Sequence, residues 1–169
     1  VMSELAGIET PPLAQQYPCR VPVWWGRHGS VEQDSELIGV SGRLVTLRIA
    51  KNFKRYERWL AKILRAPKEL RRPLDRMNSV LWELCDGSRT FEAICIEMDH
   101  LFKEEIAPVI SRTAVALALF QQHNILLILE EPLSGRWSVG PGTTPEHQEL
   151  SPLDDDHPYD TDLLVGEQA

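Results

Sequence analysis

The sequence predicts an α+β fold in which short antiparallel strands precede a core of three helices. Over residues 43–49, apolar and polar residues alternate as in a half-buried strand. Residues 74–87 carry a helical apolar stripe with a start and a stop signal, and a second helical pattern follows after a short turn. Two helices joined in this way are typical of a helix-turn-helix. We expect one folded domain over residues 21–140.

The N-terminal part is predicted to be a flexible arm followed by an edge strand. Residues 1–20 lack periodicity and contain three prolines, which is typical of a mobile chain end. Residues 21–25 have the pattern of a strand. Its two tryptophans, Trp24 and Trp25, are expected to pack the arm onto the domain, with an exposed binding patch as the alternative.

A hairpin is predicted next, with residues 36–40 and 43–49 as its strands and Ser41-Gly42 as its turn. Residues 52–66 then read as an inserted amphipathic helix, whose apolar stripe is bordered by Lys and Arg. Packing of this helix on the domain surface is the plainest interpretation. A membrane-interface helix and a docking helix for a partner enzyme are the alternatives.

The first core helix follows a third strand, predicted over residues 70–74. Because Pro73 cannot donate a ladder hydrogen bond, this strand should lie at a sheet edge. Asp75 is suited to cap the helix, and Gly87 to end it in a left-handed conformation. The inward stripe consists of Met77, Val80, Leu81, Leu84 and Cys85.

Two further helices are predicted over residues 91–103 and 108–123. Ser88 or Thr90 can cap the former, and the latter begins with a proline, which suits a first helical turn. Together with the first core helix they should enclose most of the apolar side chains. The helical half of the fold is therefore expected to contain the core.

The C-terminal part is predicted to lose order. Asn124 tolerates the left-handed backbone that ends a helix, and residues 125–129 read as a short buried strand. A last hairpin is expected around Ser134-Gly135. Residues 141–169 are rich in Pro, Gly, Thr and acidic residues, so we expect a disordered acidic tail.

Composition favours a protein of a reducing compartment. The three cysteines are an odd number without metal-ligand spacing, and Cys85 and Cys95 fall on apolar helix faces, so we expect buried thiols in the cytoplasm. No run of about 18 apolar residues and no signal peptide occurs in the sequence, so neither membrane spanning nor secretion is expected.

The net charge of −7 conceals two oppositely charged segments. Residues 43–76 contain twelve basic residues against three acidic ones, a local charge of +9. Residues 130–169 contain ten acidic residues against one arginine, a local charge of −9. This division predicts either an acidic partner for the basic segment or the protein's own tail lying across it.

Catalytic motifs are not found. The sequence has no phosphate-binding loop, dinucleotide fingerprint, nucleophile elbow or zinc-protease motif. Its five histidines are scattered, and the run Asp154–Asp156 reads as part of a solvated tail. We therefore expect a protein that is not an enzyme and that holds neither a metal nor a cofactor.

Residues in and around the first core helix resemble the PqqD family, which comprises small winged-helix proteins also called precursor-peptide recognition elements. The most specific part is the junction Asp86-Gly87-x-Arg89-Thr90. The resemblance covers residues 67–129 and departs in two places, since minimal members lack the inserted helix and usually end the third core helix with Asn-Gly. The matching residues are Pro67, Lys68, Leu74, Asp75, Ser79, Trp82, Glu83, Leu84, Asp86, Gly87, Arg89 and Thr90.

The resemblance implies a winged helix-turn-helix that binds peptides without catalysis. Family members act as peptide chaperones in cofactor and peptide biosynthesis: they bind the leader of a ribosomal precursor peptide and present it to a modifying enzyme, often a radical-SAM protein. The leader adds a strand to the sheet edge and lies against the third core helix. Carried over to this chain, the peptide-binding residues are Leu70, Arg71, Arg72, Leu74, Arg112, Val115, Ala116 and Leu119.

Other functions stay open at this level. Winged helices commonly bind nucleic acid, and the basic segment favours that alternative. The third core helix lacks the polar side chains that read bases, so no specific nucleic-acid binding is expected. A scaffold or membrane-adjacent adaptor acting through the inserted helix is another alternative, and the protein can also form a homodimer. For Val115, Ala116 and Leu119, a place in the core is the competing interpretation.

Overall fold

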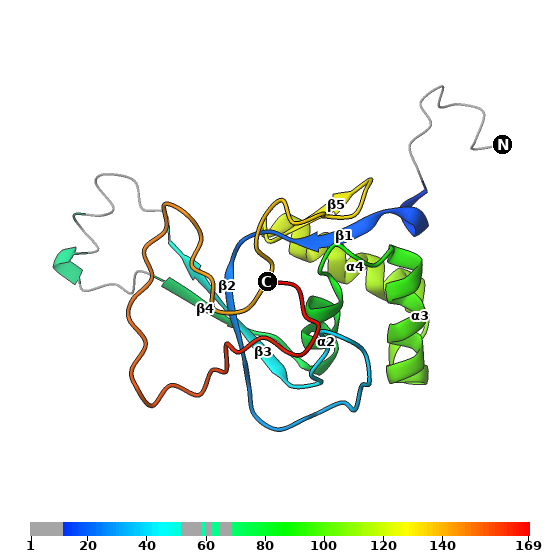
Figure 1. Ribbon diagram of the computed structural model, residues 1–169, viewed down its shortest axis with the longest axis horizontal. Coiled ribbons are helices and arrows are strands. Elements are labelled where there is room, and N and C mark those ends of the chain that lie inside the picture. The colour runs from blue at the N-terminus through cyan, green and yellow to red at the C-terminus, as the bar shows by residue number, and fades with distance from the viewer. Residues whose placement is uncertain (1–11, 52–58, 60–61, 65–68) are drawn as a thin grey trace.

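A computed structural model describes residues 12–51, 59, 62–64 and 69–169 of the chain. It is an α+β structure with antiparallel sheets, as the sequence predicts. Three strands form one sheet in the order β2-β3-β4, and two form another, β1-β5 (Figure 1). The strands are β1 (Tyr17–Arg20), β2 (Trp24–His28), β3 (Leu44–Ala50), β4 (Glu69–Pro73) and β5 (Leu126–Leu129). The helices are α2 (Arg76–Leu84), α3 (Phe91–Phe102) and α4 (Val109–Gln122), with 3-10 turns η1 (Leu13–Gln15) and η2 (Lys103–Ile106).

The N-terminal arm is shorter than predicted. Residues 1–11 lie outside the described part of the chain, but residues 17–20 form β1, which pairs with β5. Cys19 and Arg20 are fully buried there. Pro18 has no N–H to donate, but it is tolerated because ladder bonds alternate along the strand and its backbone points away from β5. Its carbonyl accepts a hydrogen bond from the Gly87 N–H instead. The prediction of a flexible arm up to residue 20 was therefore wrong for β1.

The predicted hairpin around Ser41-Gly42 is also wrong. Residues 36–40 form no strand, and the partner of β3 is β2, which lies further upstream and runs three residues beyond the predicted 21–25. The hairpin does not form because the Gly42 carbonyl already accepts hydrogen bonds from the N–H groups of Glu32 and Gln33. The positive φ of 71° and the close approach of the Gln33 carbonyl leave no room for a side chain at Gly42. The segment therefore folds into a long loop.

The helix boundaries were predicted well because capping is local. The Asp75 carboxylate accepts a hydrogen bond from the Asn78 N–H at 2.8 Å and begins α2. Thr90 caps α3 in the same way through the Ala93 N–H, at 3.2 Å. Gly87 has a φ of +79°, and Asn124, after α4, has a φ of +57°. These local signals place α2, α3 and α4 within one or two residues of their predicted ends.

Helix α2 is the centre of the core. The predicted stripe is buried except for the half-buried Met77, but Ser79, Trp82 and Glu83 are buried as well. The Ser79 hydroxyl accepts a hydrogen bond from the Val45 N–H and donates one to the Leu74 carbonyl, so it joins α2 to both β3 and β4. One helix is thus surrounded by the sheet, α3 and α4, which leaves it no solvent-facing side.

The C-terminal segment, predicted to be disordered, crosses the β2 edge of the β2-β3-β4 sheet, from the face of Trp24 to the face of Arg27, which α2 covers. Tyr159 packs edge-on against Trp24 at 5.6 Å between ring centroids, and Asp160 forms a β-bridge with Arg27. Buried arginines bind this segment, and composition alone does not reveal them. The expected hairpin around Ser134-Gly135 is wrong too, because those residues form a turn and no strand.

The inserted helix predicted over residues 52–66 lies mostly outside the described residues. Trp59 and residues 62–64 are helical and exposed, which is all that can be placed. In the described part of the chain, no helix is both long and apolar enough to cross a membrane.

Candidate functional site

The outer edge of β4 carries backbone groups that have no hydrogen-bond partner among the described residues. The Leu74 N–H donates to the Val45 carbonyl of β3 at 2.8 Å. Because ladder bonds alternate along an antiparallel strand, Arg72 points its backbone groups toward β3 and Arg71 points its own groups outward. Among the described residues, no hydrogen bond reaches the Arg71 backbone from outside, and Arg71 and Pro73 are both exposed. The prediction that this strand lies at an edge is confirmed.

One face of α4 is exposed and partly apolar. Arg112, Val115 and Leu119 follow a helical spacing of three and four residues and therefore lie on one side of α4. Val115 is 61% exposed and Leu119 is 50% exposed. Ala116 is half-buried and packs against the core, so the competing core interpretation describes Ala116 but not its two neighbours.

A contact between Arg72 and His123 joins β4 to the end of α4. The Arg72 Nη1 atom lies 3.0 Å from the His123 Nε2 atom. Leu70, on the same face of β4 as Arg72, is 40% exposed, whereas Leu74 is half-buried and packs against the core. We call the exposed set the β4–α4 surface. It consists of the side chains of Leu70, Arg72, Arg112, Val115, Leu119 and His123, together with the outward backbone of Arg71 at the strand edge.

The β4–α4 surface is basic. Arg72 and Arg112 form no ion pair with a carboxylate in the part of the chain that the structure describes. Arg112 instead donates to the Glu105 backbone carbonyl, and Glu105 itself pairs with Arg76. A planar guanidinium without a carboxylate partner is suited to bind an acidic side chain.

On the opposite face of β4, Glu69 gathers several donors. Its carboxylate accepts two hydrogen bonds from Arg48, at 3.0 and 2.7 Å, and one from Arg71 at 3.1 Å. The Ser151 N–H adds a fourth bond, at 3.2 Å, from the C-terminal segment. Burial alone would raise the pKa of Glu69, but these bonds, with those from Arg48 first, outweigh it and lower the pKa. Glu69 therefore remains a carboxylate that connects β3, β4 and the C-terminal segment.

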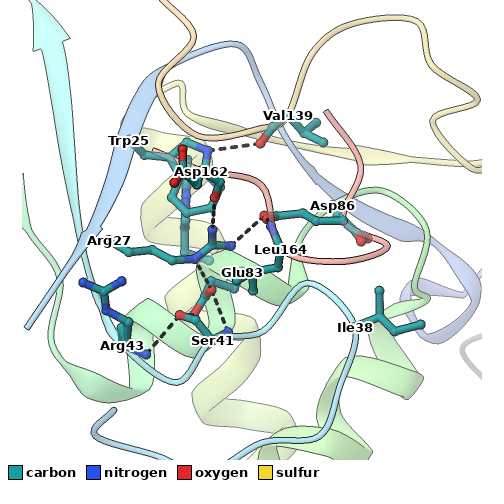
Figure 2. A network of polar contacts seen from close by, with 12 residues as sticks. Trp25, Arg27, Ile38, Ser41, Arg43, Glu83, Asp86, Val139, Asp162 and Leu164 are labelled. Carbon is teal, nitrogen blue, oxygen red and sulfur yellow. Dashed lines mark hydrogen bonds and ion pairs between the residues drawn. The ribbon is translucent and has the colours of Figure 1, made fainter. Parts of the chain in front are cut away.

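A buried ionic network lies on the other side of the sheet, at β2 (Figure 2). The Arg27 Nε atom donates to Glu83 at 2.8 Å, and its Nη2 atom donates to Glu167 at 2.6 Å. Glu83 also accepts from the Ser41 N–H and hydroxyl. Burial alone would lower the pKa of Arg27, but Glu167 and Glu83 outweigh it and raise the pKa. This network anchors the C-terminal segment to α2.

A second buried arginine, Arg20, binds only carbonyls. It donates to Trp82 and Glu83 at the end of α2 and to Val139, which places its cation where helix carbonyls lack partners. Its guanidinium carbon also lies 4.9 Å from the centroid of the Trp25 ring. Arg20 therefore stabilises the meeting point of β1, β2 and α2, and its burial keeps it from contact with a ligand in solution.

Sequence reasoning missed these ionic centres. One signal was available, because an acidic residue stands inside the apolar run of α2 as Trp82-Glu83-Leu84. A buried carboxylate needs a cation, but the sequence offers many arginines and does not say which one. The pairing joins residues more than fifty positions apart and is fixed only by the fold.

The described residues offer little for covalent or metal chemistry. Burial raises the pKa of the Cys19 thiol to about 11, and it raises the pKa of Cys85 well above the usual range, so neither is a ready nucleophile. No group of three or more His, Cys, Asp or Glu that could hold a metal ion occurs among them.

Comparison with known proteins gave no match. No family model matches the chain, and no curated protein and no solved structure matches it with significance.

Proposed function

We propose that the protein is a non-catalytic peptide-binding module and that an extended peptide adds a strand to the outer edge of β4. The observation that carries this proposal is the outward-pointing Arg71 backbone, which has no hydrogen-bond partner among the described residues, on the strand whose Arg72 contacts His123 at the end of α4. Main-chain hydrogen bonds would supply affinity, and alternate side chains of the peptide would meet α4. The basic character of the β4–α4 surface favours a peptide with acidic residues.

The order of elements supports a winged-helix arrangement for this module. Three antiparallel strands lead directly into α2, α3 and α4, and a short turn joins α2 to α3. The resemblance to the PqqD family rests on the residues of this turn. Within the proposal, the ligand is the leader of a ribosomal precursor peptide, and a modifying enzyme such as a radical-SAM protein receives it.

Nucleic-acid binding is less favoured, because most described arginines of the basic segment already have carboxylate partners. Arg43 pairs with Asp160, Arg48 and Arg71 pair with Glu69, and Arg76 pairs with Glu105. Among the described arginines of this segment, Arg72 alone has no carboxylate partner and could displace the counterions of a duplex. The alternative of an adaptor acting through residues 52–66 lies outside the described residues.

The test begins with random peptides displayed on phage and selected on the full chain. Selected peptides are then measured by calorimetry against Arg71→Pro and Ala116→Trp. Arg71→Pro removes one outward N–H, so the affinity should fall about five-fold or more, the equivalent of one hydrogen bond of about 1 kcal/mol. Ala116→Trp should block the helix side of the surface. Val31→Pro, in an exposed loop, is the matched control.

Two results would overturn the proposal. One is that no peptide is enriched by the full chain. The other is that enriched peptides bind wild type, Arg71→Pro and Ala116→Trp with equal affinity, since binding would then lie elsewhere on the protein.

A further inference from the structure

Residues 143–159 form a loop whose two ends meet at β2. The Gly142 N–H donates to the Trp25 carbonyl at 2.8 Å, and Asp160 exchanges two backbone hydrogen bonds with Arg27, at 2.9 and 2.7 Å. Gly142 also touches Thr161 so closely that a side chain at Gly142 would clash with it. A loop with ends this close is an Ω-type loop, and we call it the acidic loop.

The tip of the acidic loop is fixed beside β4. The Ser151 N–H binds the Glu69 carboxylate, and the Ser151 carbonyl accepts from Arg48 at 2.5 Å. Glu149 lies two residues from this anchor and Asp154 three, so their Cα atoms are within about 7 and 11 Å of Ser151. These distances are close to the screening length of about 8–10 Å at physiological salt. Both carboxylates are therefore held within about one screening length of the Ser151 anchor at Glu69, the first residue of β4.

The acidic loop has a negative charge that no cation among the described residues pairs with. It contains five acidic residues and no lysine or arginine. All five are exposed, and none takes part in an ion pair among the described residues. They are Glu146, Glu149, Asp154, Asp155 and Asp156.

The two faces of β4 consequently differ in charge. Leu70 and Arg72 point to the helix side, where Arg72 lies 3.0 Å from His123 at the end of α4 and has no carboxylate partner among the described residues. Glu69 and Arg71 point to the other side, where the Glu69 carboxylate is shared by Arg48 and Arg71 and the five carboxylates of the acidic loop exceed the one remaining positive charge. Successive side chains of an added strand point to opposite faces, so they would meet opposite charges in turn.

We propose that the β4 edge selects peptides in which acidic or apolar residues alternate with basic ones, with the acidic row facing α4 and the basic row facing the acidic loop. This inference rests on the proposed strand addition at β4 and defines the class of peptide that the edge accepts. The acidic loop acts by attracting basic side chains and by repelling acidic ones that face it.

The test uses two synthetic peptides of identical composition on the full chain. The alternating peptide repeats Lys-Glu-Lys-Leu, and the block peptide carries all its lysines at one end. At physiological salt the alternating peptide should bind about three- to ten-fold more tightly, the scale of a few cross-strand charge pairs. In the double variant Glu149→Gln, Asp154→Asn this preference should fall by at least half. The control Glu104→Gln, Asp99→Asn changes two exposed acids on other elements and should leave it unchanged.

Failure of this inference is distinct from failure of strand addition. Equal binding of the two peptides, with both still weakened by Arg71→Pro, would overturn the charge pattern and leave the docking edge in place. The charge pattern also fails if phage-selected peptides bind and the alternating peptide does not. Should the preference survive in the double variant, the acidic loop would not be its source.

Discussion

The outer edges of β2 and β4, the two outer strands of the three-stranded sheet, differ in their backbone hydrogen bonding. Along β2, the chain itself supplies partners, since Gly142 and Asp160 bind the outward groups of Trp25 and Arg27. Along β4, the outward groups of Arg71 meet no described residue. Trp25 and Arg27 are each 1% exposed, whereas Leu70 on β4 is 40% exposed.

This difference shows how one sheet can be protected at one edge and remain available at the other. An open edge is a hazard because it can pair with any other chain. The C-terminal segment removes this hazard at β2 with only a few backbone bonds, because the buried ion pair between Arg27 and Glu167 fixes its position. At β4, shortness, Pro73 and exposed arginines limit non-specific pairing, and under the proposed function a peptide strand takes the edge that the described residues leave open.

The largest expected effect comes from removing the cation that closes the β2 edge. Arg27→Met leaves Glu83 and Glu167 buried without their partner, so the free energy of unfolding should fall by about 3–5 kcal/mol, measured by urea denaturation. Arg43→Met is the matched control, because its pair with Asp160 is 25% and 40% exposed at the two side chains. In Arg43→Met the free energy of unfolding should fall by no more than about 1 kcal/mol. Equal losses of unfolding free energy in the two variants would show that the buried Arg27 network contributes no more to stability than the exposed Arg43 pair.

A proline substitution at each edge should have a smaller effect on the free energy of unfolding, and the comparison distinguishes the two edges directly. Asp160→Pro removes an N–H that donates to Arg27, and the free energy of unfolding should fall by about 1 kcal/mol relative to Asp160→Ala. Arg71→Pro removes an N–H without a described partner, so the change should stay within about 0.5 kcal/mol. The comparison fails if Arg71→Pro proves the more destabilising of the two.

The smallest expected effect is a pH dependence at β2. Burial, followed by the charge of Arg43, lowers the pKa of His28, which also lies 2.9 Å from the Thr46 hydroxyl and packs against Tyr159. The unfolded chain therefore takes up this proton first, and stability should decrease as the pH falls below the ordinary histidine value of about 6.5. Urea denaturation at several pH values should show a weaker dependence in His28→Gln. An unchanged slope in that variant would assign the effect to other groups.

Local signals in the sequence determined where the helices begin and end and that β4 lies at a sheet edge. Asp75, Thr90 and Asn124 act through backbone groups a few residues away, so their caps could be predicted without knowledge of the fold. Pro73 likewise placed β4 at an edge, because a missing N–H is a property of the residue itself. For the β4–α4 surface, the sequence provided candidate residues, and the exposures of Val115 and Leu119 came from the structure.

Only the tertiary structure decided how the C-terminal segment and the N-terminal strands are used. Residues 141–169 have the composition of a disordered tail, yet Glu167 is held by an arginine 140 positions away. Likewise, β3 pairs with β2 rather than with the nearer residues 36–40, because the Gly42 carbonyl is already bonded within the loop. Pairings over such separations depend on which partners the fold brings together, and a one-dimensional pattern contains no measure of that proximity.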